Sequence, residues 1–259
     1  MHIPDILPAP VAIAGYGFTG LTTWLCLKRI NRLPDAQAQV PKASLLTAAF
    51  FVASWIHIPT PLATVHFVLN GLLGVLLGWL AFPAILIGLL FQTVMFQHGG
   101  LSTLGVNALI MGIPALLAHG VFQLGCQLGS VQGHNQSLNQ GRSQGRNQDR
   151  SDQNLSVLPR WLLGSLGFVA GAAGLGLSVL AFFSIMVVFL PAHLDAALEQ
   201  RAIALLCLAH LPVIALEGGF TALLVLLLQR VKPELLPALP RPKPGRSSGS
   251  QARWQEKHS

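Results

Sequence analysis

The first two residues of the chain bring three nitrogen donors together. The amine of Met1, the backbone nitrogen of His2 and the His2 imidazole can close small chelate rings around one metal ion. Such donors suit Ni²⁺, Cu²⁺ and Co²⁺, whereas Mg²⁺ and Ca²⁺ prefer oxygen ligands. The imidazole must be neutral to bind, so we expect binding to weaken as the pH falls through about 6.5. A fourth ligand must come from elsewhere in the chain.

The composition indicates that these donors belong to a membrane protein. Of the 259 residues, 52% are hydrophobic and only 10% are charged, and the mean hydropathy is +0.59. A soluble domain has about 25% charged residues. The net charge of +7 comes from basic residues in loops and in the tail beside apolar runs, as orientation in a bilayer requires. We therefore predict lipid rather than nucleic acid as a partner, and an all-α multi-pass protein of the cell inner (plasma) membrane.

Seven apolar runs predict seven transmembrane helices, since about 20 apolar residues cross the hydrocarbon layer. They cover approximately residues 8–27, 43–58, 61–80, 83–96, 104–124, 161–190 and 202–228. We divide the chain into metal-binding spans 1–5 (residues 1–128), a polar cytoplasmic linker (129–158), spans 6–7 (159–231) and a basic cytoplasmic tail (232–259). The linker is rich in Gln, Asn, Ser, Gly and Arg, and we expect it to be disordered.

Positive charge orients the spans. Lys28, Arg29 and Arg32 follow the first apolar run, which predicts that this end lies in the cytoplasm and that Met1 lies outside without a cleaved signal peptide. With seven spans, the basic linker and the C-terminus are then cytoplasmic. The outer face receives histidines from four segments: His2, His57, His66 and His98.

Several polar residues near the outer face could support a ligand. His57 and His98 could hold a ligand by a hydrogen bond or bind the metal briefly on its access path, or could be interfacial histidines satisfied by backbone. Asn70 and Asn107 lie within spans, where an amide is usually paired inside the bundle. We expect them to orient a ligand, with hydrogen bonding between helices as the alternative.

Two further pairs carry lower-priority predictions. His210 and Glu217 are seven residues apart in the last span and share a helix face. We favour a structural bond or a contact with a coupling partner over a proton relay, and we expect Glu217 to lie toward mid-membrane, away from the outer site. Ala49 and Ala53 form a small-xxx-small step, which suits close helix packing against a partner or within the protein.

Four stretches are more specific than any single residue. They are MHIPD at the start, VHFVLNG at 65–71, FQHGGLSTLGVN at 96–107 and VKPELL at 231–236. Together they resemble the CbiM/NikM family, the substrate-binding S components of energy-coupling factor (ECF) transporters for cobalt and nickel. Ile6 stands where family members often have glycine.

The resemblance implies a fold, a site and partners. The fold is a seven-span S component whose extra first helix lets the amino terminus plug into the bundle. The metal is bound in square-planar fashion by the Met1 amine, the His2 amide and ring, and His66. The partners are a transmembrane T component and ATPase subunits, with a small auxiliary membrane subunit as a further candidate. Ni²⁺ or Co²⁺ is then the transported substrate, and no prosthetic group is expected.

The sequence contains no Walker A pattern, so ATP hydrolysis is expected in a partner and the chain itself is not expected to be an enzyme. We predict that it captures Ni²⁺ or Co²⁺ from the outer side, supplying cobalamin synthesis or nickel enzymes. One alternative is an intramembrane metalloenzyme, which would need a general base, and Asp5 is the only acid near the outer histidines. A passive channel would instead need weak repeated sites. The sequence does not distinguish nickel from cobalt.

Overall fold

The computed structural model describes residues 2–3, 5–33, 36–59, 64–141, 158–189 and 196–236, which form a bundle of helices with a short β-hairpin. The helices are α1 (Ala9–Ile30), α2 (Val40–Ala53), α3 (Asn70–Leu77), α4 (Ala81–Phe96), α5 (Leu104–Gly141), α6 (Arg160–Val188), α7 (Ala196–Ala209) and α8 (Leu211–Val231). The hairpin strands are β1 (His57–Pro59) and β2 (Thr64–His66), and the 3-10 turns are η1 (Gln37–Gln39), η2 (Gly78–Leu80) and η3 (Pro233–Leu235).

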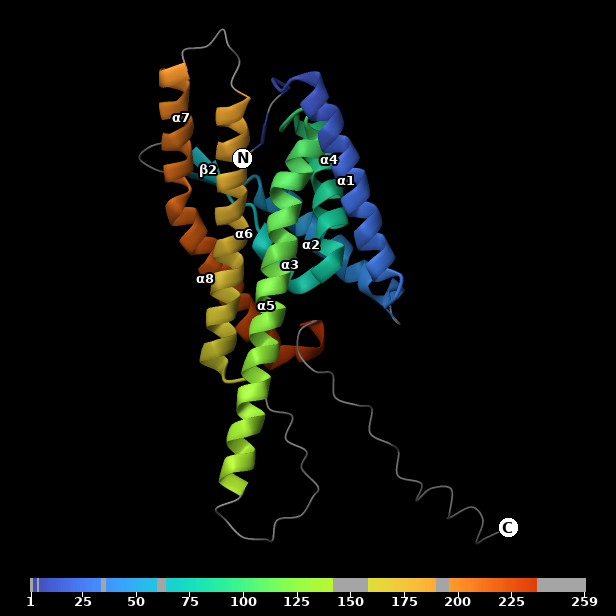
Figure 1. Ribbon diagram of the computed structural model, residues 1–259, viewed down its shortest axis with the longest axis vertical. Coiled ribbons are helices and arrows are strands. Elements are labelled where there is room, and N and C mark those ends of the chain that lie inside the picture. Colours follow the sequence, from blue (N-terminus) through green and yellow to red (C-terminus); the bar gives the residue numbers. More distant parts are fainter. Residues whose placement is uncertain are drawn as a thin grey trace, which may run out of the picture.

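Helix α5 is the central support of the bundle. It packs against α1 on one side and α6 on the other, and it also contacts α3 and α4 (Figure 1). Every residue of α3 is buried, so this short helix lies in the core. A Cβ atom at Gly74 would lie 2.0 Å from the carbonyl oxygen of Ala115. Glycine at this position therefore lets the backbones of α3 and α5 approach closely, as small residues do in membrane bundles.

Five described segments are long and apolar enough to cross a membrane. They are Ala9–Ile30, Asn70–Phe96, Leu104–Gly129, Arg160–Val188 and Leu198–Val231. This confirms a mostly helical membrane protein, while the count of seven and the orientation of the termini stay predictions. Helix α2 has 14 residues, fewer than the roughly 20 that a perpendicular crossing needs. The predicted third and fourth spans form one candidate segment, in which η2 joins α3 to α4.

The predicted second and third spans are shorter as helices than the sequence indicates. Helix α2 ends at Ala53, and the chain then forms the hairpin, so α3 begins only at Asn70. Leu69 has a φ of 56°, a left-handed conformation that a continuous helix does not allow. The two strands pair with each other, and Val65 and His66 of β2 are buried while β1 is largely exposed.

Two other boundaries differ from the sequence prediction. Helix α5 continues to Gly141, where a disordered linker is predicted from residue 129. Extending an existing helix is cheaper than starting one, and glutamine is a good helix former. The predicted seventh span breaks at His210 into α7 and α8, because Pro212 lacks an N–H and its ring opposes the preceding turn. The rest of the predicted linker, 142–157, and the tail from 237 lie outside the described residues.

Candidate metal-binding site

The β-hairpin brings two of the predicted histidines together. His57 and His66 are directly paired across the antiparallel strands, and their ring centroids are 6.3 Å apart. Directly opposed residues of an antiparallel pair point to the same face. His57 is exposed, whereas His66 is only 8% exposed. Of the two, His66 is therefore the ring that the protein surrounds.

The amino-terminal segment is held against the start of α5 by backbone hydrogen bonds. Ile3 is fully buried. Its N–H donates to Asn107 Oδ1 at 2.8 Å, and its carbonyl accepts from Asn107 Nδ2 at 3.1 Å and from Thr103 Oγ1 at 2.8 Å. Both polar groups of this residue are thus paired, and the position of His2 follows from that pairing.

Three histidine rings meet where the amino-terminal segment reaches the hairpin. The His2 ring centroid lies 5.6 Å from that of His66 and 5.5 Å from that of His98, and the His66 and His98 centroids are 6.2 Å apart. Gly99, with a φ of 78°, lies beside His2, and a Cβ added there would be 3.4 Å from His2 Cβ. The structure therefore brings together three of the four outer histidines at close range, with His57 beside His66.

Hydrogen bonds fix which nitrogen of each ring carries a lone pair. His2 Nε2 lies 2.9 Å from Gln92 Oε1, and His66 Nδ1 lies 3.0 Å from the carbonyl oxygen of Phe67. Because both oxygens only accept, these ring nitrogens must carry the proton. The lone pair is then on Nδ1 of His2, the nitrogen nearer its own backbone, and on Nε2 of His66. The His2 ring thus presents the nitrogen that can share a chelate with the backbone nitrogen of the same residue.

The environment of these rings keeps them neutral. Burial lowers the pKa of His66 to about 3, with smaller contributions from neighbouring His98 and His210. Burial, together with the nearby histidines, also holds the pKa of His2 well below its ordinary value of 6.5, and burial lowers that of His98. Desolvation penalises the charged ring, so His66 stays neutral below pH 6.5. The pH dependence of metal binding stays a prediction.

The described side chains do not form a complete metal site by themselves. Among the residues that the structure describes, no group of three or more His, Cys, Asp or Glu side chains is placed to hold one metal ion. A site at His2 and His66 must therefore use backbone nitrogens as well. Met1, the remaining predicted donor, lies outside the described residues. Asp5, the acid that the sequence predicts near the outer histidines, accepts a hydrogen bond from Ser102 in the loop between α4 and α5.

Asn70 and the alanine pair concern helix packing contacts. Asn70 is fully buried, and its Nδ2 lies within hydrogen-bonding distance of Met111 O in α5 (3.2 Å) and of Gly174 O and Ser178 Oγ in α6 (3.0 and 2.7 Å). It thus fits the helix-to-helix alternative rather than contact with a histidine. Ala49 is exposed and Ala53 is buried. They lie four residues apart in α2 and so share a helix face, and their packing role stays a prediction.

Glu217 is not where the sequence prediction places it. Its carboxylate accepts hydrogen bonds from the backbone N–H groups of Val68 and Leu69, at 3.0 Å for Leu69. It therefore touches the chain immediately after His66, and the expectation that it lies away from the outer site is wrong. The reason is that the chain from His66 to Leu69 enters the bundle as a loop before α3 begins. His210, also buried, uses Nδ1 to donate to Leu206 O at 2.7 Å.

Sequence reasoning did not single out Gln92 or Thr103. Gln92 is fully buried in α4 and accepts from His2, while Thr103 donates to Ile3. Gln92 could have been found from the sequence, because it is an amide inside an apolar run and such a polar side chain usually has a partner within the bundle. Thr103 carried no such signal, because a hydroxyl at the start of a helix is common.

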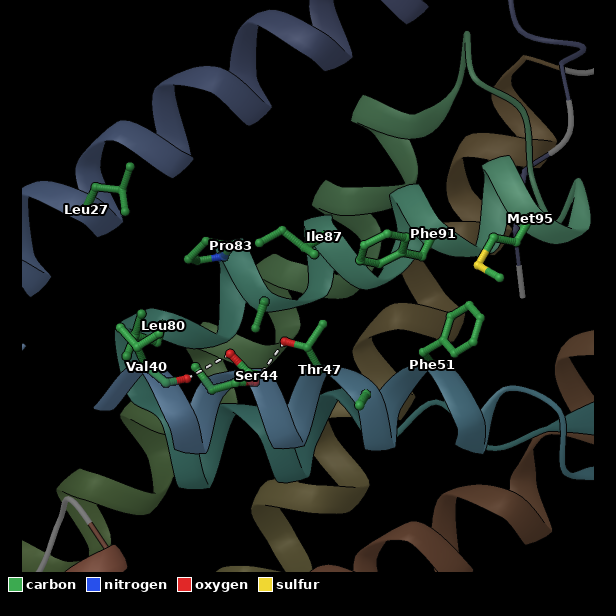
Figure 2. A pocket seen from close by; sticks show the side chains of 13 residues that line it. Leu27, Val40, Ser44, Thr47, Phe51, Leu80, Pro83, Ile87, Phe91 and Met95 are labelled. Atoms are coloured by element: carbon green, nitrogen blue, oxygen red, sulfur yellow. Dashed lines mark hydrogen bonds between the residues drawn. The ribbon is translucent and has the colours of Figure 1, made fainter. Parts of the chain in front are cut away.

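A separate apolar groove of about 600 Å³ lies between α2 and α4 and reaches Leu27 of α1 (Figure 2). The hydroxyls of Ser44 and Thr47 are turned back to the carbonyls of Val40 and Ala43. The lining thus offers no ligand set for a metal, and the histidine cluster is the candidate site.

Comparisons with known proteins identify the family of this chain and support its fold. The family model of the cobalt uptake substrate-specific transmembrane region, CbiM, matches residues 2–235. The chain belongs to this family, and it is a membrane component of cobalt or nickel transport.

One relative, from Haemophilus influenzae and provisionally named as a metal transport protein, is 30% identical over 91% of this chain and 97% of its own length. The fused nickel transport protein NikMN of Rhodobacter capsulatus is 29% identical over 91% of this chain and 64% of its own length. A crystal structure of a transition metal transporter shares the fold, with a TM-score of 0.64 at 21% identity over 89% of this chain and 93% of that one.

Proposed function

We propose that this protein is the metal-binding S component of an ECF-type importer and captures Ni²⁺ or Co²⁺ at its outer face. The observation that carries the proposal is the position of His2. Asn107 and Thr103 hydrogen-bond the backbone of Ile3, and we call this arrangement the clasp on Ile3. The clasp holds His2 beside His66, which is far away in the sequence. Membership of the cobalt uptake family and the nickel transport relative support these two metals as substrates.

In this proposal the metal has four nitrogen ligands in a plane. Met1 supplies its amine, His2 its amide nitrogen and ring Nδ1, and His66 its Nε2. The hydrogen bond from His2 Nε2 to Gln92 supports this assignment, because it leaves Nδ1 for the metal. A deprotonated amide nitrogen is a strong ligand for ions that gain from a square-planar nitrogen field, which favours Ni²⁺ over Co²⁺. In this proposal His98 and the exposed His57 bind the ion briefly as it enters.

Transport against a gradient requires energy that this chain does not supply. We propose a seven-span arrangement in the plasma membrane with the amino terminus outside and the carboxyl terminus in the cytoplasm. A T component and ATPase subunits, with or without a small auxiliary subunit, would then use ATP to release the ion inward. The metalloenzyme alternative is not favoured, since Asp5 is engaged by Ser102 and the relatives are transport proteins.

The experiment is a titration of purified protein with Ni²⁺ and Co²⁺ after blocking the amine. Acetylation, or extension by one residue before Met1, removes the primary amine from its chelate position. We expect the affinity to fall by more than the roughly 10–100-fold that losing an outer hydrogen-bond partner costs. His66→Ala should remove most of the remaining affinity, and His57→Ala, at an exposed ring, should cost less.

An unchanged affinity after acetylation would refute the chelate. Equal losses from acetylation, His66→Ala and His57→Ala would refute the ligand assignment.

A further inference from the structure

A single carboxylate connects the last helix to the chain that carries His66. Glu217, on α8, is only 1% exposed, and each of its oxygens accepts a backbone N–H, from Val68 and from Leu69. A carboxylate inside a membrane bundle is costly unless it is paired. The two N–H groups belong to an irregular segment between β2 and α3, where buried backbone groups also need partners. The three groups therefore satisfy one another.

The bond to Val68 has a second consequence, which follows from the covalent structure. The Val68 N–H and the Phe67 carbonyl are the two ends of one planar peptide group. On its other side, this carbonyl accepts the Nδ1–H of His66 at 3.0 Å. The hydrogen-bond chain therefore runs from the Glu217 carboxylate through the Phe67–Val68 peptide to the imidazole of His66. Hydrogen bonds in such a chain polarise and strengthen one another.

We propose that Glu217 is a positioning residue for the metal ligand His66 and acts through the Phe67–Val68 peptide. The proposal rests on the function proposed above. The carboxylate holds the peptide plane, the peptide carbonyl holds the ring and its proton on Nδ1, and Nε2 is thereby presented to the metal. A metal-bound histidine commonly donates its other N–H to a carboxylate or a carbonyl, which orients the ring and makes it a better donor. Here the Phe67 carbonyl accepts the N–H of the His66 ring, and the Glu217 carboxylate accepts the N–H of the same peptide group.

Because Glu217 belongs to α8, the orientation of the His66 ring also depends on the position of α8. Helix α8 packs mainly on α6 and starts at the break after α7. Movement of α8 relative to α3 would pull on the peptide that orients His66.

The test measures Ni²⁺ affinity of the full chain carrying Glu217→Gln. The substitution keeps the shape but replaces one accepting oxygen by an NH₂ group that opposes a backbone N–H. We expect the affinity to fall by roughly 10–100-fold, with a changed visible absorption spectrum of the bound Ni²⁺. Thr221→Val is the matched control, since Thr221 lies one turn further along α8, is 1% exposed and makes no hydrogen bond through Oγ1. Its affinity should stay within twofold of the unmodified protein.

A double-mutant cycle separates positioning from general stability. In a His66→Ala background, Glu217→Gln should cause no further loss of Ni²⁺ affinity, because the ring that it orients is gone. A residue that only stabilises the fold would weaken the remaining donors as well. If Glu217→Gln does not fold, Glu217→Asp replaces it in the same cycle, since it keeps the charge and retracts it by one methylene.

The outcomes distinguish this inference from the proposed function. If the unmodified protein binds neither Ni²⁺ nor Co²⁺, the proposed function fails. If it binds Ni²⁺ and the Glu217 variant binds within twofold of it, the positioning role is overturned while the function stands. An equal loss in Thr221→Val, or a further loss in the His66→Ala background, also overturns the positioning role.

Discussion

The hydrogen bonds around Ile3 allow a quantitative test of how the amino terminus is placed. In Asn107→Leu the side chain keeps the same number of heavy atoms and the same branching but loses both its acceptor and its donor. The Ile3 N–H, on a fully buried residue, then has lost the acceptor that stood 2.8 Å away. The Ile3 carbonyl keeps Thr103 as a donor at 2.8 Å. The main cost is therefore one orphaned backbone N–H.

An orphaned buried donor costs about 1–3 kcal/mol, which corresponds to roughly a 5–150-fold shift in an equilibrium. This cost disappears when the amino-terminal segment leaves its position against α5 and the Ile3 N–H binds water. If only the docked segment lets His2 and His66 share a metal, the apparent affinity falls in proportion to the docked fraction. We expect Asn107→Leu to weaken Ni²⁺ binding by up to this factor, which is reached in full when the segment of the variant is mostly undocked.

Thr103→Val provides a graded comparison. It removes one of two donors to the Ile3 carbonyl and leaves Asn107 Nδ2 at 3.1 Å. Losing a satisfied hydrogen bond with a remaining partner costs about 0.5–1.5 kcal/mol, or roughly 2–13-fold. The loss should therefore be smaller than for Asn107→Leu.

The assay is a competition titration of Ni²⁺ against a coloured chelator, with the protein in detergent micelles. The rate of acylation of the amino-terminal amine, measured without metal, reports undocking directly and should rise in the same order. If Asn107→Leu folds and binds Ni²⁺ within twofold of the unmodified protein, docking through Ile3 does not control the metal site.

The remaining predictions concern protonation and packing. His66 has a pKa of about 3 in the folded protein against 6.5 in an unfolded chain, so the unfolded chain binds more protons between these values. Its contribution to stability is complete above pH 6.5 and is lost as the pH falls toward 3. The unfolding temperature of the metal-free protein should drop over that range, and His66→Gln should reduce the slope; an identical slope would contradict the assignment. Gly74→Ala should destabilise the protein by about 1–3 kcal/mol, since the new Cβ would meet the Ala115 carbonyl, whereas Gly20→Ala, with no atom within 4 Å, should be tolerated. Thermal unfolding of both variants checks this, and equal unfolding temperatures would argue against the close approach of α3 and α5.

Part of the fold and site could be read from local patterns. Apolar runs of sufficient length predict α1, α6 and most of α5, because each helix satisfies its own backbone in lipid. The residue types at Met1 and His2 indicate nitrogen-ligand chemistry, and the family resemblance implies His66 as a further ligand. The bounds of α2 and α3 were not predictable in this way, because the turn at Leu69 depends on contacts made by a distant helix.

By itself, the sequence determined the class of the protein, a helical membrane protein of the cobalt uptake family with a histidine as its second residue. Only the tertiary structure decided how these groups are held. The clasp of Asn107 on Ile3, the bond of Gln92 to His2 and the reach of Glu217 to Val68 join residues about 90 to 150 positions apart. No periodicity encodes such contacts, since they form only when helices pack and each buried polar group finds its partner.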